Sequence, residues 1–188
     1  MLVGVLATAC ARSAPVAPVG AATPVAGESP PQTSAAVLPQ VQSARHSLGP
    51  LALGLTESEV LQVLGQPEQL TPEVEEAATG NLVLGWKYPK LGLTLTMARV
   101  ASTQPLTLLR FTATAPCRFA TNRGIRIGSS RAALDAAYAA DYARDAAAND
   151  SAGGTDQQHA VVDSIYGGVV FAFEHHLVAE IFLGAAAE

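Results

Sequence analysis

The chain has few positive charges, and this scarcity limits what it can bind. Lysine occurs only at Lys87 and Lys90, the arginines are scattered, and the formal net charge is −5. Proteins that hold nucleic acid gather Lys and Arg side chains against the phosphates. The sequence contains no such cluster, so it argues against a nucleic-acid partner.

Several other features that indicate a particular chemistry are also absent. No apolar run approaches the roughly 20 residues of a membrane-spanning helix. The only cysteines are Cys10 and Cys117, too few for a disulfide framework. The glycine-rich phosphate motifs and the Gly-x-Ser-x-Gly elbow do not occur. The sequence therefore predicts no cofactor and no catalytic residue.

The first ten residues resemble a bacterial export signal. Leu2 to Ala9 is a short apolar run, and the small residues Ala7 and Ala9 precede Cys10. In a lipobox, a cysteine that follows small residues is lipidated and becomes the mature N-terminus, so Cys10 is the predicted lipidation site. The same small residues suit an ordinary signal peptidase. An apolar N-terminus with a chance cysteine is the third alternative.

Residues 11–47 have the composition of a tether. The stretch consists mainly of Ala, Pro, Val, Ser, Thr and Gln, with prolines at positions 15, 18, 24, 30, 31 and 39. Prolines at this density prevent regular helix and strand hydrogen bonding. The stretch also has too little periodic apolar surface to offset the entropy of ordering it. A lipidated cysteine followed by such a tether would hold a folded body away from a membrane.

The rest of the chain contains one pattern twice. Leu51 to Gly65 reads LALGLTESEVLQVLG, and Ile125 to Ala139 reads IRIGSSRAALDAAYA. Gly54 and Gly128 are 74 positions apart, as are Val60 and Leu134; Leu95 and Phe171 are 76 apart, and Phe111 and Phe182 are 71 apart. Near-constant offsets predict a duplication. We therefore expect a first α/β repeat over residues 48–116 and a second over 117–188.

Each expected repeat consists of a helix and an antiparallel meander. Thr56 and Glu59 form a capping box at the start of the first helix, Gly65 ends it, and Ser129 or Ser130 caps the second. Thr71-Pro72-Glu73 suggests a further helical turn. Alternating apolar residues predict strands, at 82–88, 91–97, 106–113, 161–166, 169–173 and 177–183. The predicted fold class is α+β, with one open sheet and the helices packed on one face.

The repeated pattern resembles the small repeat of a known group of proteins. Gly54, Thr56, Val60, Gly65 and Pro67 carry the match in the first copy, and Gly128, Ser130 and Leu134 carry it in the second. They resemble the tandem α/β repeats of bacterial envelope lipoproteins, including the small lipoprotein of the outer-membrane β-barrel assembly machine, and the fold of β-lactamase inhibitory protein. Ala139 and Asp141 replace the second Gly and Pro. The resemblance implies protein binding without catalysis and assigns no functional residue.

Few residues are candidates for a site. Trp86, Tyr88 and Tyr166 would form an aromatic binding patch if they project from the sheet face away from the helices, and would be core if they project inward. Cys117 is either a buried small hydrophobe, a disulfide partner of Cys10 or a nucleophile that needs a nearby histidine.

Metal binding is a further alternative that the sequence does not favour. His175 and His176 are adjacent on a predicted hairpin, so their side chains would not chelate one ion easily. His46 and His159 fall in irregular segments. The Asp145–Asp156 loop has oxygen ligands but not the spacing of a calcium loop; these ligands are Asn149, Asp150, Ser151 and Asp156.

These observations predict an exported, lipid-anchored, non-catalytic protein-binding module of the bacterial cell envelope. Its expected partners are an envelope protein and, through the lipid on Cys10, a membrane. A small envelope hydrolase and a calcium- or zinc-binding envelope protein are the alternatives.

Overall fold

The computed structural model describes residues 45–147, 158–164 and 167–185. The predicted signal segment, Cys10 and nearly all of the tether lie outside these residues, and so does Tyr166. The described residues belong to one compact unit that spans residues 35–188.

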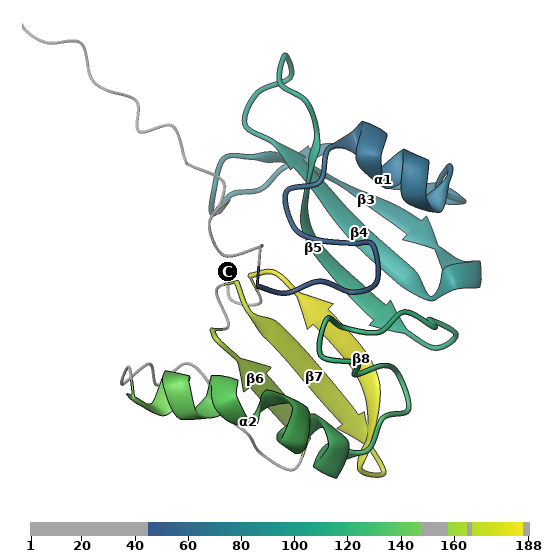
Figure 1. Ribbon diagram of the computed structural model, residues 1–188. Coiled ribbons are helices and arrows are strands. Elements are labelled where there is room, and N and C mark those ends of the chain that lie inside the picture. The colour runs from purple at the N-terminus through teal and green to yellow at the C-terminus, as the bar shows by residue number, and fades with distance from the viewer. Residues whose placement is uncertain (1–44, 148–157, 165–166, 186–188) are drawn as a thin grey trace, which may run out of the picture. The chain divides into compact units, whose positions relative to one another are not determined.

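The fold is α+β, as predicted, and strands dominate it (Figure 1). The helices are α1 (Glu57–Leu64) and α2 (Arg131–Ala147), with a 3₁₀ turn at Pro89–Leu91. The strands are β1 (Gln69–Leu70), β2 (Val74–Glu75), β3 (Leu82–Tyr88), β4 (Leu93–Arg99), β5 (Thr107–Thr114), β6 (His159–Val162), β7 (Val169–Glu174) and β8 (Leu177–Leu183). They form one antiparallel sheet in the order β1-β3-β4-β5-β8-β7-β6, with β2 also paired to β3.

Both helices pack on the same apolar face of this sheet. Val60 of α1 and Leu134 and Tyr138 of α2 belong to one core with the inward side chains of the strands. The ring of Tyr138 lies 5.5 Å from that of Phe171 on β7. We call the side of the sheet that faces away from the helices the outer face.

Trp86 and Tyr88 do not form the surface patch that we considered. They are 3% and 2% exposed, on the inner face of β3, and the Tyr88 hydroxyl donates to the carbonyl of Gly65 at the end of α1. Alternation places both on the side that the helix covers. Trp86 and Tyr88 are therefore core residues, which was the other alternative for them.

The two helices begin as their capping residues predict. At α1, the Thr56 side chain accepts from the backbone N–H of Glu59, and the Glu59 carboxylate accepts from the N–H of Thr56. At α2, the Ser130 hydroxyl accepts from the N–H of Ala133, so Ser130 rather than Ser129 is the cap. The expected helical turn at Thr71-Pro72-Glu73 is wrong: these residues connect β1 to β2, which both pair along the edge of β3.

Three backbone hydrogen bonds recur between the two halves of the chain, residues 48–116 and 117–185. In the first half, the N–H groups of Gly54, Leu108 and Glu57 donate to Leu108, Leu55 and Leu106. In the second half, Gly128, Val178 and Arg131 donate to Val178, Ser129 and His176. Every residue of the second set lies 74 or 70 positions after its counterpart. Gly54 and Gly128 also share a left-handed backbone, with φ of 83° and 86°.

The two meanders also carry a β-bulge at the same place. The β4–β5 register shifts between Thr96 and Met97, and the β7–β8 register shifts between Ala172 and Phe173. Leu109 and Ala179 are the extra residues, 70 positions apart. A bulge inserts one unpaired residue and bends the strand, so it is a specific feature to find twice.

The pairing of β5 with β8 relates the halves by a local two-fold axis. Thr112 pairs with Phe182, 70 positions later, while Phe111 pairs with Leu183 and Ala113 with Ile181. The counterpart of Phe111 is therefore Ile181, and our match of Phe111 to Phe182 was wrong by one residue. Such a shift matters because neighbouring strand residues face opposite sides: Phe111 and Ile181 are buried, whereas Phe182 is half-buried on the outer face.

Candidate functional site: a hollow on the outer face of the sheet

Part of the outer face of the first half is covered by the chain itself. Residues 65–81, which join α1 to β3, return along this face. Glu76 reaches the outward side chain of Arg110 at 3.1 Å, and Glu73 pairs with Arg99 at 2.5 Å. Val83 and Ala98 face outward here but are only 8% and 0% exposed. The outer face of the first half is therefore closed around Val83, Ala98 and Arg110, whereas Lys87, Thr94 and Thr114 on the same face stay exposed.

The outer face of the second half is hollowed. One hollow of about 720 Å³ lies over β7 and β8, and a second of about 350 Å³ adjoins it toward β5. They share His159, Ala172 and Glu180. Ala115, Ile127, Ala172 and Ala179 line the larger hollow, and Val170 and Phe182 line the smaller. Small and apolar side chains thus leave room above the strands.

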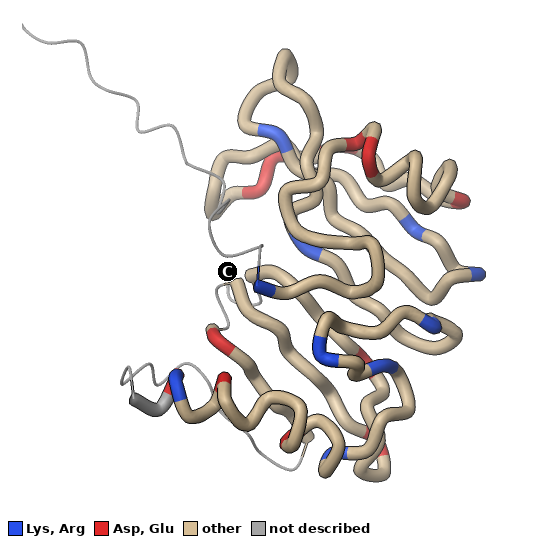
Figure 2. Tube along the Cα trace, in the orientation of Figure 1, with Lys and Arg blue, Asp and Glu red and all other residues tan. Residues whose placement is uncertain are grey.

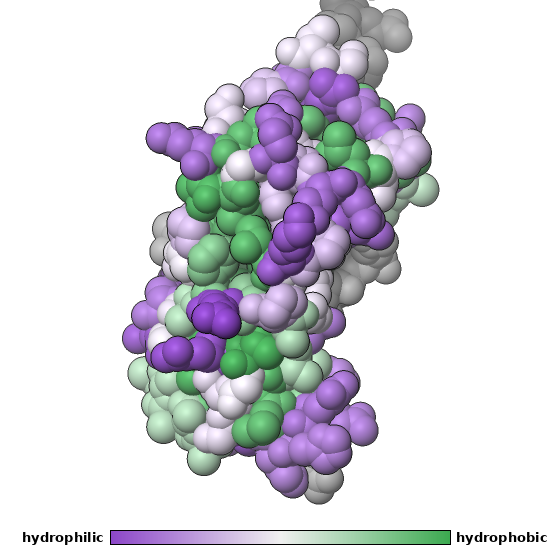
Figure 3. All heavy atoms as spheres, turned by 90° about the vertical axis from the view of Figure 1, so that its right-hand side faces the viewer, coloured by the Kyte–Doolittle hydropathy of each residue, from purple (hydrophilic) through white to green (hydrophobic). Residues whose placement is uncertain are grey.

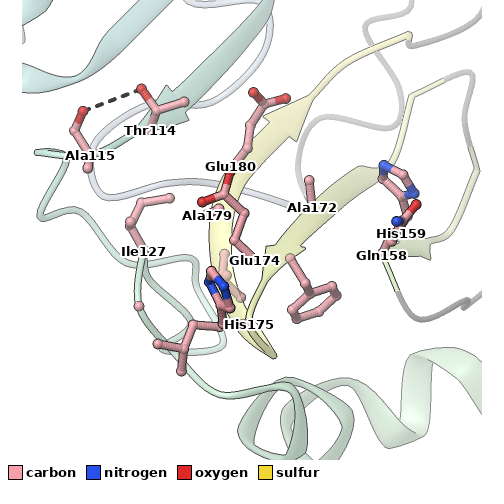
Figure 4. Close-up of a pocket in the computed structure, with 14 residues that line it drawn as sticks. Thr114, Ala115, Ile127, Gln158, His159, Ala172, Glu174, His175, Ala179 and Glu180 are labelled. Carbon is pink, nitrogen blue, oxygen red and sulfur yellow. Dashed lines mark hydrogen bonds between the residues drawn. The ribbon is translucent and has the colours of Figure 1, made fainter.

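Two carboxylates project into this hollow (Figure 4). Glu180 lies opposite Ala172, and Glu174 lies opposite Leu177, so the two acids are diagonal neighbours on one face of the β7–β8 pair. Figure 4 shows them between Ala115 and Ile127 on one side and Ala172 and His159 on the other. Neither carboxylate forms an ion pair or a hydrogen bond with any residue that the structure describes. Glu180 is half-buried, which makes its charge the more costly to leave unpaired.

A tight turn lies beside the hollow, between β7 and β8. His175 and His176 both have positive φ, 52° and 64°, which are the values of a two-residue hairpin turn between β7 and β8. The predicted turn at Glu174-His175-His176 is confirmed.

The surface of the molecule is mixed in character. On the side seen in Figure 3, apolar and polar side chains form patches that lie next to one another.

A second polar feature lies at the C-terminal part of α2, where acidic and basic residues meet in Figure 2. Arg144 contacts Asp141 at 3.1 Å and Asp145 at 3.3 Å, and it also pairs with Asp163. Asp163 accepts a bond from His46 as well. Burial raises the pKa of Asp163, but the His46 bond and the charges of His46, Arg144 and Arg45 outweigh burial, so the pKa lies below its ordinary value.

This cluster holds the beginning of the described chain against the second half. His46 is 4% exposed, and Leu48, two residues later, is fully buried. The N–H of Asn122 donates to Ser47, and the N–H of Gly49 donates to Ala120. Every charge in the cluster has an opposite partner, so its contacts are those of a structural clasp between the segment at 45–51 and α2.

Cys117 is positioned as a core residue rather than as a nucleophile. It is 7% exposed, and burial raises the pKa of its thiol, against a smaller lowering by a backbone hydrogen bond from Phe119. Within the described ranges, no histidine is hydrogen-bonded to it, and it forms no disulfide. A thiol of raised pKa is less reactive because the thiolate is the nucleophile.

The described residues include no cluster of three side chains that could hold a metal ion. Asn149, Asp150, Ser151 and Asp156 of the considered calcium loop lie outside the described residues. Glu174 and Glu180 were missed as site residues. Their outward position in the predicted hairpin was the available signal, but the sequence does not reveal the open space above them.

No protein family model matches the chain, and no curated protein or solved structure is significantly similar to it. Neither helix of the described part has the length and apolar character needed to cross a membrane.

Proposed function

We propose that this protein is an exported, non-catalytic protein-binding module of the bacterial cell envelope, anchored by lipid on Cys10. The outer face of the second half is its binding surface. The observation that carries this proposal is the hollow over β7 and β8, which joins small apolar side chains to two carboxylates without partners among the described residues. A surface of this kind offers both contact area and orienting polar groups.

We further propose that the two halves are tandem repeats that arose by duplication. The recurring hydrogen bonds, the matching bulges and the two-fold pairing of β5 with β8 support this proposal. Two identical units related in this way would have formed an isologous interface, with the same strand from each unit paired to itself.

The anchoring part of the proposal is tested by mass. The protein is expressed from its own gene in a bacterial host, beside Cys10→Ser, and both intact masses are measured. We expect a gain that matches diacylglycerol and acylation in the parent and none in the variant. An unmodified chain that starts at Met1 would contradict anchoring. An unlipidated chain cleaved near Ala9 would show plain secretion.

The binding part is tested by cross-linking in the same host. The photoreactive amino acid p-benzoylphenylalanine replaces Ala179 in the hollow or, as a matched control, Ala136 on the exposed side of α2. We expect one reproducible protein adduct from position 179 and none from position 136. Equal labelling from both positions, or none from 179, would contradict a binding role for the hollow.

A further inference from the structure

Arg110 and Glu180 occupy corresponding positions in the two meanders. Arg110 lies opposite Thr96 on the outer face, and Glu180 lies opposite Ala172, each directly after its bulge residue. They are 70 positions apart, as are the paired backbone groups of their strands. The same place in the sheet therefore carries a positive charge in the first half and a negative charge in the second.

The first half shows what covers this position. The segment between α1 and β3 returns along the outer face and sets the carboxylate of Glu76 on Arg110. The side chain of Thr71 lies over Gly85 and accepts from its N–H at 2.6 Å. In the first half, therefore, the sheet face at Arg110 is contacted by a short segment of the same chain, and this segment carries the opposite charge.

The corresponding connection of the second half does not supply the matching charge. Residues 148–158 join α2 to β6, and they include Asp150 and Asp156 but neither Lys nor Arg. Among the described residues, His159 and His175 are the only basic side chains of the larger hollow, whereas Arg110, which pairs with Glu76, lines the smaller hollow together with Glu180. A cation on the larger-hollow side of Glu180 is therefore not supplied by the described residues that line this hollow.

We propose that the hollow binds an extended segment of the partner protein and that a Lys or Arg of this segment pairs with Glu180. This proposal rests on the proposed function and specifies the chemistry of its partner. Ala115, Ala172 and Ala179 leave space for the segment's backbone, and Glu174 adds a second negative charge on the diagonal. A charge-assisted hydrogen bond to a half-buried carboxylate is stronger than one between neutral groups.

The test uses the full chain and two short fluorescent peptides of Thr, Val and Ala that differ only in a central Lys or Glu. Fluorescence anisotropy measures the dissociation constant of each. We expect the Lys peptide to bind at least about tenfold more tightly than the Glu peptide. Glu180→Gln should weaken Lys-peptide binding about tenfold, and Glu180→Lys should reverse the preference. Glu75→Gln, at an exposed acid of the first half, should change neither.

Three results would overturn the proposal: equal affinity for both peptides, a Lys-peptide affinity that Glu180→Lys does not reduce, or no Lys-peptide binding up to about 1 mM. Far-UV circular dichroism of each variant shows that the fold is kept. The cross-link from position 179 shows whether only the basic-segment proposal fails or whether the proposed protein-binding function fails as well. An adduct that persists in Glu180→Lys would leave protein binding supported and the basic segment refuted, whereas no adduct would refute both.

Discussion

In the first half, the segment between the helix and the meander returns over the sheet and places Glu76 on Arg110; in the second, Glu180 stands at the corresponding position without an ionic partner among the described residues. The inner faces of the two halves are alike, since the same backbone bonds and the same bulge hold each helix to its meander. The two halves thus differ on the outer face of the sheet, where the side chains do not pack in the core. This difference lies away from the core that both helices cover.

The largest expected effects come from truncating corresponding core residues. Leu95→Ala and Phe171→Ala each empty space beneath the sheet, where both side chains are fully buried, and we expect losses of about 2–5 and 3–5 kcal/mol in the free energy of unfolding. Trp86, the only tryptophan, lies in the first half. Because β5 and β8 join the halves into one sheet, Phe171→Ala should shift the urea transition seen by Trp86 fluorescence as well as that seen by circular dichroism. A Trp86 transition that Phe171→Ala leaves unchanged would show that the halves unfold separately.

The next effect concerns the clasp at Asp163, which joins the segment at 45–51 to the second half. Asp163→Asn removes the charge that pairs with His46 and Arg144, and we expect a loss of about 2 kcal/mol near neutral pH. Asparagine tolerates the positive φ of 67° at this position, so backbone strain does not confuse the result.

The pH dependence of the same variant gives a second readout. The pKa of Asp163 in the folded protein lies below its ordinary 3.8. Its stabilising contribution is therefore present above about pH 4 and is lost as the pH falls through the folded pKa. Urea titrations of parent and variant should converge in acid. A stability difference that stays constant down to the acid limit of folding would contradict the ionic role.

Smaller and equal effects are expected at the two left-handed glycines. Gly54→Ala and Gly128→Ala force a side chain into a backbone conformation that costs about 1–2 kcal/mol. At Gly128 no atom lies within 4 Å of the added Cβ, so only the backbone strain should count there. Thermal unfolding monitored by circular dichroism measures both losses. A neutral result at Gly128 would show that the turn is not held in this conformation.

The smallest effects distinguish the two helix caps. Thr56→Ala breaks a reciprocal capping box and should cost about 1 kcal/mol, whereas Ser130→Ala removes one hydrogen bond and should cost less. Ala133 occupies the position that corresponds to Glu59, so Ala133→Glu should complete a box in the second half and raise its stability by a few tenths of a kcal/mol. Urea midpoints compare the three variants. A larger loss at Ser130 than at Thr56 would contradict this difference.

Local features of the fold could be predicted from the sequence, and those that depend on distant contacts could not. Thr56 and Glu59 identified the first helix, and the alternation through Leu93, Leu95 and Met97 identified a strand, because each pattern satisfies its own backbone or one face. Matching Phe111 to Phe182 by residue type failed because Ile181 carries the inward position.

The hollow could not be predicted from the sequence for a similar reason. Its openness depends on which connection returns over the sheet, and the pairing of Glu76 with Arg110 joins residues 34 positions apart that no short motif relates. The buried positions of Trp86 and Tyr88 depend on which face of β3 is turned toward α1. Alternation shows that the two residues share a face, but it does not show which face the helix covers.

Carboxylate labelling tests most directly whether the outer face is covered at Arg110 in the first half and open at Glu180 in the second. The folded full chain is treated with a carbodiimide and an amine, and mass spectrometry of its peptides gives the modification rate of Glu180 and of Glu76. We predict that Glu180 reacts several times faster than Glu76, because Glu76 is held by Arg110, and that the Lys peptide slows Glu180 selectively. A Glu180 that reacts as slowly as Glu76 without any ligand would show that the second half is covered as well, and would contradict the proposed binding surface.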